Sequence, residues 1–161
     1  MEGVTVIRKN KLFRALTLNA KEILESTMDR DRKLEAICNL LKDNVRYYNW
    51  VGFYVVNKER SAELVLVSYM GEPTQHLRIP FGKGICGQAA MLRETIVVQD
   101  VSKEDNYLSC SLKVKSEIVV PIFRNDEVVG ELDIDSHIAS AFTLEDEAFL
   151  KDIVEMVSAF L

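Results

Sequence analysis

The sequence predicts an α+β domain in which helices from both ends of the chain flank an antiparallel sheet. Two observations predict this fold class. Apolar residues follow helical spacing near both ends of the chain, whereas they alternate with a period of two through its middle. The alternating segments are connected largely as hairpins, which is typical of antiparallel pairing. We therefore expect the helices to cover one face of the sheet.

The length of the chain fits one domain. Of its 161 residues, 48% are hydrophobic and 28% are charged, which is ordinary for a soluble globular protein. A chain of this size builds one core more readily than two. We expect a single domain over residues 1–161, with N-terminal helices at about 11–46, a sheet with its pocket loops at about 47–137, and a C-terminal helix at about 143–160.

Charge and hydropathy exclude several partner classes. The formal net charge is −5 and the basic residues form no stripe, so nucleic acid is not an expected partner. No segment approaches the roughly 20 apolar residues of a membrane helix, and the N-terminus lacks a signal-peptide core. The expected location is cytoplasmic, with no membrane partner.

Helical spacing marks the two ends. The first stripe lies within residues 11–27, and Asp29-Arg-Asp interrupts it before a second stripe from Leu34 to Val45. Thr143 with Asp146 three residues later is typical of a helix N-cap. The apolar stripe of the final helix follows, carried by Phe149, Leu150, Ile153, Val154, Val157 and Phe160.

Period-two segments fill the middle of the chain. They predict strands at YNWVGFYVV, ELVLVSYM, HLRIPF, TIVVQ, EIVVPIF and EVVGELDID. GKGICGQAAMLRE begins as a glycine loop and becomes a short helix, and residues 100–116 form a long polar connection. Arg124-Asn125-Asp126 is a tight hairpin turn between the last two strands.

One face of these strands collects carboxyl groups. Residues two apart in a strand share a face, so Glu131, Asp133 and Asp135 of GELDID lie together. If the strands share one sheet, the same face carries Glu117, and Trp50 and Tyr54 flank a slot above Gly52. Either these acids are solvated, or they line a pocket under the long connection. In a pocket, burial and mutual repulsion raise carboxyl pKa values and keep one acid protonated near neutral pH.

The three cysteines are Cys38, Cys86 and Cys110, an odd number that argues against a structural disulfide framework. Cys38 lies on an apolar helical stripe, which indicates core packing. Cys86 lies in GKGICG, which matches a dinucleotide fingerprint but follows no first strand of a parallel unit. The helix start there favours an anion and a Cys86 thiolate. Cys86 and Cys110 are candidates for a reversible pair.

No metal site is expected. His76 and His137 lack metal-ligand spacing with the cysteines. Asp133 and Asp135 resemble a Mg²⁺ pair or the start of a phosphatase motif, but the supporting residues of both are missing.

Five segments together resemble a known family. NWVGFY, RIPFGKGICG, CSLKVKSEIVVPI, VVGELDIDS and F-T-x-E-D occur in the order found in the free methionine-R-sulfoxide reductases, a branch of the GAF-domain proteins. The resemblance runs from about residue 35 to the C-terminus. It implies a GAF fold, with a six-stranded antiparallel sheet, the N- and C-terminal helices packed on one face and the ligand pocket on the other.

The resemblance also implies an activity and its residues. Cys110 matches the nucleophile and Cys86 the second family cysteine, while Glu117, Asp133 and Asp135 match the acids that hold the sulfoxide. The substrate-binding residues implied are Trp50, Tyr54, Gly84, Ile85, Cys86, Glu117, Asp133 and Asp135. The expected substrate is free methionine-R-sulfoxide, with no cofactor and with reducing equivalents from thioredoxin or another dithiol. The resemblance also implies a homodimer that pairs through the terminal helices.

One position departs from the family. His76 stands where better-known members carry another cysteine, the usual disulfide partner of the nucleophile. Either Cys86 resolves the oxidised nucleophile or an external thiol does. Two other functions stay open at this point: a non-catalytic GAF sensory module that binds a small ligand, and a thiol redox sensor using Cys86 and Cys110.

Overall fold

The computed structural model describes residues 2–108 and 111–161. Its helices are α1 (Glu2–Glu25), α2 (Arg30–Asn44), α3 (Gly84–Leu92) and α4 (Leu144–Ser158), with a 3₁₀ turn η1 (Val101–Lys103). Its strands are β1 (Trp50–Val56), β2 (Glu63–Met70), β3 (Arg78–Pro80), β4 (Ile96–Val98), β5 (Ser116–Arg124) and β6 (Glu127–Ser136). Within this described part, the strands form one six-stranded antiparallel sheet in the order β3-β2-β1-β6-β5-β4. The predicted fold class is confirmed.

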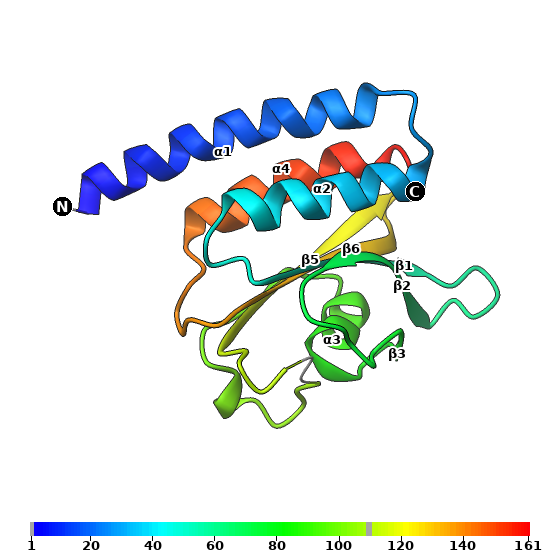
Figure 1. The fold of residues 1–161 in the computed structure, drawn as a ribbon. Coiled ribbons are helices and arrows are strands. Elements are labelled where there is room, and N and C mark those ends of the chain that lie inside the picture. Colours follow the sequence, from blue (N-terminus) through cyan, green and yellow to red (C-terminus); the bar gives the residue numbers. More distant parts are fainter. Residues whose placement is uncertain (1, 109–110) are drawn as a thin grey trace.

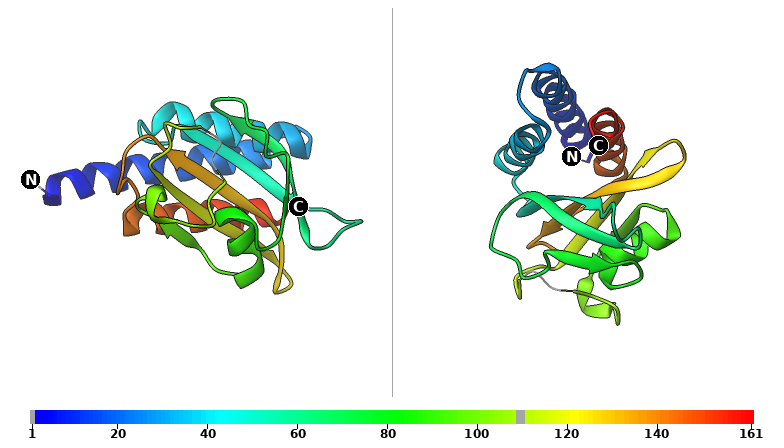
Figure 2. Two further views of the ribbon diagram at one scale, coloured as in Figure 1. Left: turned by 90° about the horizontal axis from the view of Figure 1, so that it is seen from below. Right: turned by 90° about the vertical axis from the view of Figure 1, so that its right-hand side faces the viewer.

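The sheet separates two layers that are built from different helices. Helices α1, α2 and α4 lie on one face, whereas α3 and η1 lie on the other (Figure 1). The view along the sheet edge shows the same separation (Figure 2, right). None of the helices in the described ranges has both the length and the apolar character that crossing a membrane requires.

The two layers have separate hydrophobic cores. The helix-side core contains the strand side chains that point toward the helices, and Cys38 of α2 is fully buried in it. These strand residues are Val51, Phe53, Ile118, Val120, Ile122, Leu132 and Ile134. The core on the other side joins α3 to the opposite strand face, through Trp50, Tyr54, Ile79, Ile85, Cys86 and Val119 among others. Period-two alternation therefore predicted which side of each central strand faces the helices.

Local signals set the ends of the elements. Asp29, predicted as a helix breaker, is the N-cap of α2 and accepts a hydrogen bond from the Arg32 N–H at 3.0 Å. Thr143 and Asp146 form a capping box at α4. The β5–β6 turn places Asn125 and Asp126 at φ values of 52° and 60°, as a two-residue hairpin requires.

Helix α1 is longer than the sequence pattern indicates. It begins at Glu2, whereas the apolar stripe supports a helix only from about residue 11. Residues 3–8 are exposed, including Val4, Val6 and Ile7, so this end of α1 presents no buried stripe from which a pattern could be recognised.

A buried carboxylate links α1 and α4 to the start of β1. Asp146 is fully buried, and its Oδ1 accepts hydrogen bonds from the hydroxyls of Tyr47 and Tyr48, each at 2.7 Å. Lys9 of α1 pairs with the other carboxylate oxygen. A buried charge held by this many donors fixes the helical layer in register with the sheet.

Candidate active site

The acid row of β6 lies at the centre of the sheet. In the register with β1, Trp50 is opposite Asp135, Gly52 is opposite Asp133, and Tyr54 is opposite Glu131. All three acids are buried on the face away from the terminal helices. The pocket interpretation is therefore correct, and the alternative of a solvated acidic face is excluded.

A fourth acid and a cysteine complete the cluster. Glu117 of β5 is opposite Asp135 in the β5–β6 register and is also buried. Cys86, in the first turn of α3, has its Sγ 4.0 Å from Glu117 Oε1. One ligating atom each from Cys86, Glu117 and Asp133 lies within 4.8 Å of the other two. Three segments distant in sequence thus meet at one point.

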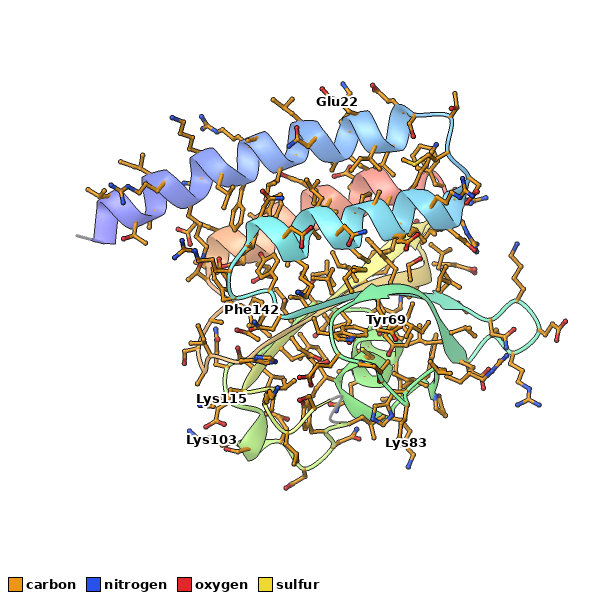
Figure 3. All side chains as sticks on the ribbon, in the orientation of Figure 1. Glu22, Tyr69, Lys83, Lys103, Lys115 and Phe142 are labelled. Carbon is orange, nitrogen blue, oxygen red and sulfur yellow. The ribbon has the colours of Figure 1, made fainter. Side chains whose placement is uncertain are left out.

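The acids have few compensating partners. Both carboxyl oxygens of Glu131, and the Oδ1 atoms of Asp133 and Asp135, are buried without a hydrogen-bond partner. None of the ion pairs formed among the described residues includes any of these three acids. Lys83 is at the edge of the site, but its side chain is exposed and points away from the domain (Figure 3).

Burial shifts the protonation of the cluster. It raises the pKa of Asp133 from 3.8 to about 6, although hydrogen bonds with Glu117 and Cys86 oppose the shift. It raises the pKa values of Glu131 and Asp135 well above their usual range, and the charge of Asp133 adds to both shifts. The cluster therefore keeps protons at pH values where exposed carboxyls have lost theirs.

Cys86 does not have the stabilised thiolate that its place at a helix start predicts. Burial raises the pKa of its thiol well above the usual value, and the charges of Asp133, Glu131 and Glu117 raise it further. The free N–H groups of a helix start favour a thiolate by a modest amount, whereas desolvation and neighbouring anions act at shorter range. The prediction was wrong because the sequence did not show that Cys86 faces the acids.

The glycine loop brings α3 close to the cluster. Gly84 opens the helix at a φ of 63°, a conformation that glycine adopts without strain. Its N–H donates to Asn106 Oδ1 at 2.9 Å, which ties the loop to the long connection. Gly84, Ile85 and Cys86 all line the cavity described below.

The aromatic residues are placed differently from each other. Trp50 stacks on Tyr69 with ring centroids 5.4 Å apart, and its Nε1–H donates to the Glu72 carbonyl at 3.0 Å. Its indole lies directly over Gly52, so the slot expected above that glycine is filled by Trp50 itself. Tyr54 lines the cavity, and its hydroxyl donates to the His76 carbonyl at 2.9 Å.

The cavity at the cluster is small, and most of its lining residues are buried. Its volume is about 10 Å³, close to the space of one water molecule. It is lined by Tyr54, His76, Ile79, Lys83, Gly84, Ile85, Cys86, Leu108, Glu117 and Asp133. A larger groove of about 870 Å³ lies near the tips of the hairpins, but none of its lining residues is buried. The small cavity is therefore the site with perturbed chemistry.

The expected nucleophile, Cys110, lies outside the described residues. Leu108, two residues before it, lines the cavity. Lys113, three residues after it, forms an ion pair with Glu72 at 2.7 Å.

The structure adds residues that the sequence prediction left out of the site. Glu131 is fully buried and lies next to Asp133 on the same strand face. Its position two residues before Asp133 in GELDID was enough to predict that it belongs to the site. Lys83 and Leu108 line the cavity but carry no pattern that singles them out in the sequence, and His76, which the sequence marked only as a departure from the family, lines it as well.

The sequence matches the family described as "GAF domain" over residues 29–161. The chain belongs to this family. It is 33% identical over 149 residues to GAF domain-containing protein A of Dictyostelium discoideum, with 92% of each chain covered. It is 34% identical over 157 residues to the free methionine-R-sulfoxide reductase of Saccharomyces cerevisiae, with 88% of this chain and 87% of that protein covered.

A solved structure agrees with both the fold and the branch. The free methionine-R-sulfoxide reductase of Neisseria meningitidis, determined in complex with its substrate, superposes with a TM-score of 0.88 at 34% identity. The match covers 94% of this chain and 89% of that one. The resemblance found in the sequence is thereby confirmed: this GAF domain has the free methionine-R-sulfoxide reductases among its relatives.

Proposed function

We propose that this protein reduces free methionine-R-sulfoxide to methionine with a cysteine nucleophile. One observation supports the proposal above others: four buried carboxyls share the strand face opposite the terminal helices, and two of them, Glu117 and Asp133, lie close to Cys86. Burying several acids that repel one another costs stability, and a face that only binds a ligand without catalysing a reaction has no need for them. The similarity to reductases from yeast and Neisseria meningitidis supplies the substrate class.

The acids activate the sulfoxide oxygen. Sulfur in a sulfoxide becomes electrophilic when its oxygen accepts a proton or a strong hydrogen bond. Because burial raises the pKa values of Glu131, Asp133 and Asp135, the cluster supplies that proton near neutral pH. Asp133 and Glu117 both line the cavity, which supports Asp133 as the acid that faces the oxygen.

The thiol chemistry proceeds in two stages. The Cys110 thiolate forms an S–S bond to the sulfoxide sulfur as the S–O bond breaks, and the oxygen leaves as water after accepting two protons. Water then attacks the Cys110 sulfur and breaks the S–S bond, which releases methionine and one proton and leaves a sulfenic acid on Cys110. The Cys86 thiol then attacks that sulfenic acid, forming a Cys86–Cys110 disulfide and releasing water. A thioredoxin-like dithiol reduces the disulfide, so the cycle uses no prosthetic cofactor.

Of the two cysteines that the structure describes, Cys86 is the one suited to resolve the reaction, because the family resemblance implies the usual disulfide partner at the position that His76 occupies here. Cys38 is excluded from this role because it is fully buried in the helix-side core. The Cys86 thiol stays protonated in the resting protein, which keeps it from competing for the substrate. A reducing, cytoplasmic setting fits this cycle.

Substrate entry requires the cavity lining to move. A volume of about 10 Å³ does not admit free methionine sulfoxide. Leu108 closes the cavity from the long connection, and Ile85 closes it from α3. We expect Trp50 and Tyr54 to contact the methyl and sulfur groups once the lining has opened.

The test is turnover of racemic free methionine sulfoxide with dithiothreitol, following methionine and both diastereomers. We expect loss of the R-form at sulfur only, abolished by Cys110→Ser and retained in the matched control Cys38→Ser. Cys86→Ser should retain activity with dithiothreitol and lose it with thioredoxin. If neither diastereomer is consumed, the reductase proposal fails. Oxidation of both cysteines by peroxide in that case would favour a redox sensor.

A further inference from the structure

The site contains a set of atoms that suits a metal ion. Cys86 Sγ, a Glu117 oxygen and an Asp133 oxygen come from α3, β5 and β6, and all three lie within 4.8 Å of one another. Each of the three residues is at most 5% exposed. Linear spacing gave no sign of this set, because its members belong to three separate segments.

The distances are compatible with zinc coordination. Zinc bonds are about 2.3 Å to thiolate sulfur and about 2.1 Å to carboxylate oxygen. The 4.0 Å between Cys86 Sγ and Glu117 Oε1 is shorter than the sum of those two bonds. One ion therefore reaches both atoms, with an angle of roughly 130° between the bonds. The Asp133 oxygen, which lies within 4.8 Å of the other two atoms, enters the same shell after a side-chain shift of at most about 1.4 Å.

A second observation points independently to a small polar guest. Asp133 Oδ1 is buried without a hydrogen-bond partner, and Asp133 lines the cavity of about 10 Å³. That volume fits a single water or ion and no organic molecule. A buried carboxylate oxygen without a donor gains most from a cation.

The charge of the surrounding acids and the types of ligand atom indicate which ion would bind. Glu131 and Asp135 add negative charge behind the ligand set and have no ion-pair partner among the described residues. A thiolate with two carboxylates favours zinc-class dications over Mg²⁺ and Ca²⁺, which take oxygen ligands.

We propose that Cys86, Glu117 and Asp133 bind one zinc-class dication in the substrate-free protein. Three protein ligands leave the fourth tetrahedral position to water. Binding replaces the Cys86 proton, which is released to solvent. The bound ion occupies the cavity and engages Cys86, so it excludes substrate and prevents the disulfide step. This last consequence rests on the proposed reductase function; the binding itself does not.

The test uses Co²⁺ as a spectroscopic substitute for zinc. The reduced full chain, free of chelators and added thiols, is titrated with Co²⁺ and followed by its thiolate-to-cobalt charge-transfer absorption. We expect one equivalent to bind and zinc to displace it. Cys86→Ser should lose the charge-transfer band, and Asp133→Asn should weaken binding by at least roughly tenfold.

Variants of the other two cysteines test whether Cys86 is the cysteine that binds the metal. Cys110→Ser and Cys38→Ser should keep the band, because neither cysteine belongs to the ligand set. Loss of the band in Cys110→Ser with retention in Cys86→Ser would overturn the assignment, as would the absence of saturable binding. Circular dichroism of each variant establishes that it is folded. Because the titration uses no sulfoxide, its failure is distinguishable from failure of the reductase assay.

Discussion

Replacing Asp133 with Asn tests how much stability the domain loses by holding its acid row in the interior. The side chain is 3% exposed, and burial raises its pKa from 3.8 to about 6. The carboxyl binds its proton more tightly in the folded state than in the unfolded state. Its contribution to stability is therefore complete below about pH 3.8 and is lost as the pH rises through about 6.

The size of the effect follows from the same values. One pKa unit corresponds to about 1.4 kcal/mol, so the shift from 3.8 to about 6 is equivalent to about 3 kcal/mol. Asn keeps the shape and an acceptor oxygen but carries no charge. We expect Asp133→Asn to be more stable than the natural protein near pH 8, by up to about 3 kcal/mol. Near pH 4 the gain should disappear.

Urea unfolding at several pH values measures this difference directly. The matched control is Asp152→Asn, an exposed acid on α4 that is expected to change little at any pH. In a domain of this size the gain corresponds to a rise in melting temperature of about 6–12 °C at most. If Asp133→Asn is destabilised near pH 8, or if its stability keeps the pH slope of the natural protein, the buried-charge reasoning is refuted.

Three further predictions concern other positions in the domain. Gly52→Ala places a methyl group 2.5 Å from Trp50 Cζ3, so the indole must move; we expect altered tryptophan fluorescence and a fall in kcat/KM of roughly 10²-fold, and unchanged fluorescence would count against the packing described. Asp146→Ala leaves buried donors without an acceptor and should lower the free energy of unfolding by roughly 3–5 kcal/mol, measured in urea; a loss below 1 kcal/mol, the scale of one ordinary hydrogen bond, would show that the network is not structural. Glu131→Gln removes a charge that raises the pKa of the Cys86 thiol, so alkylation of Cys86 should begin at lower pH; an unshifted pH profile would mean that Glu131 does not act on Cys86.

Much of the architecture could be predicted from local rules. Alternation identified which face of β1, β5 and β6 packs on the helices and which face carries the site, because a strand places every second side chain on one side whatever its partners are. Hairpin chemistry located the turn at Asn125 and Asp126 for a similar reason, since only a few residue types accept those backbone angles.

The remaining features depend on contacts between distant segments. The sequence placed Cys86 at a helix start, but whether that helix faces solvent or acids is decided by how α3 packs on the sheet. Gly52 suggested an open slot, but the Trp50 rotamer decides whether the slot is open or filled. The exposed start of α1 could not be predicted, because a helix without a buried face has no apolar period.

The acid row gives the two proposed activities opposite pH dependences, and this distinguishes them at one site. Sulfoxide activation needs a protonated carboxyl, so turnover should fall once the cluster has lost its last proton. Metal binding needs Cys86, Glu117 and Asp133 without protons, so affinity for a dication should rise over the same range. Because the pKa of Asp133 is about 6, the two curves should begin to diverge there. If turnover and Co²⁺ affinity instead rise together with pH, these acids do not supply the proton, and the row would act as a cation site alone.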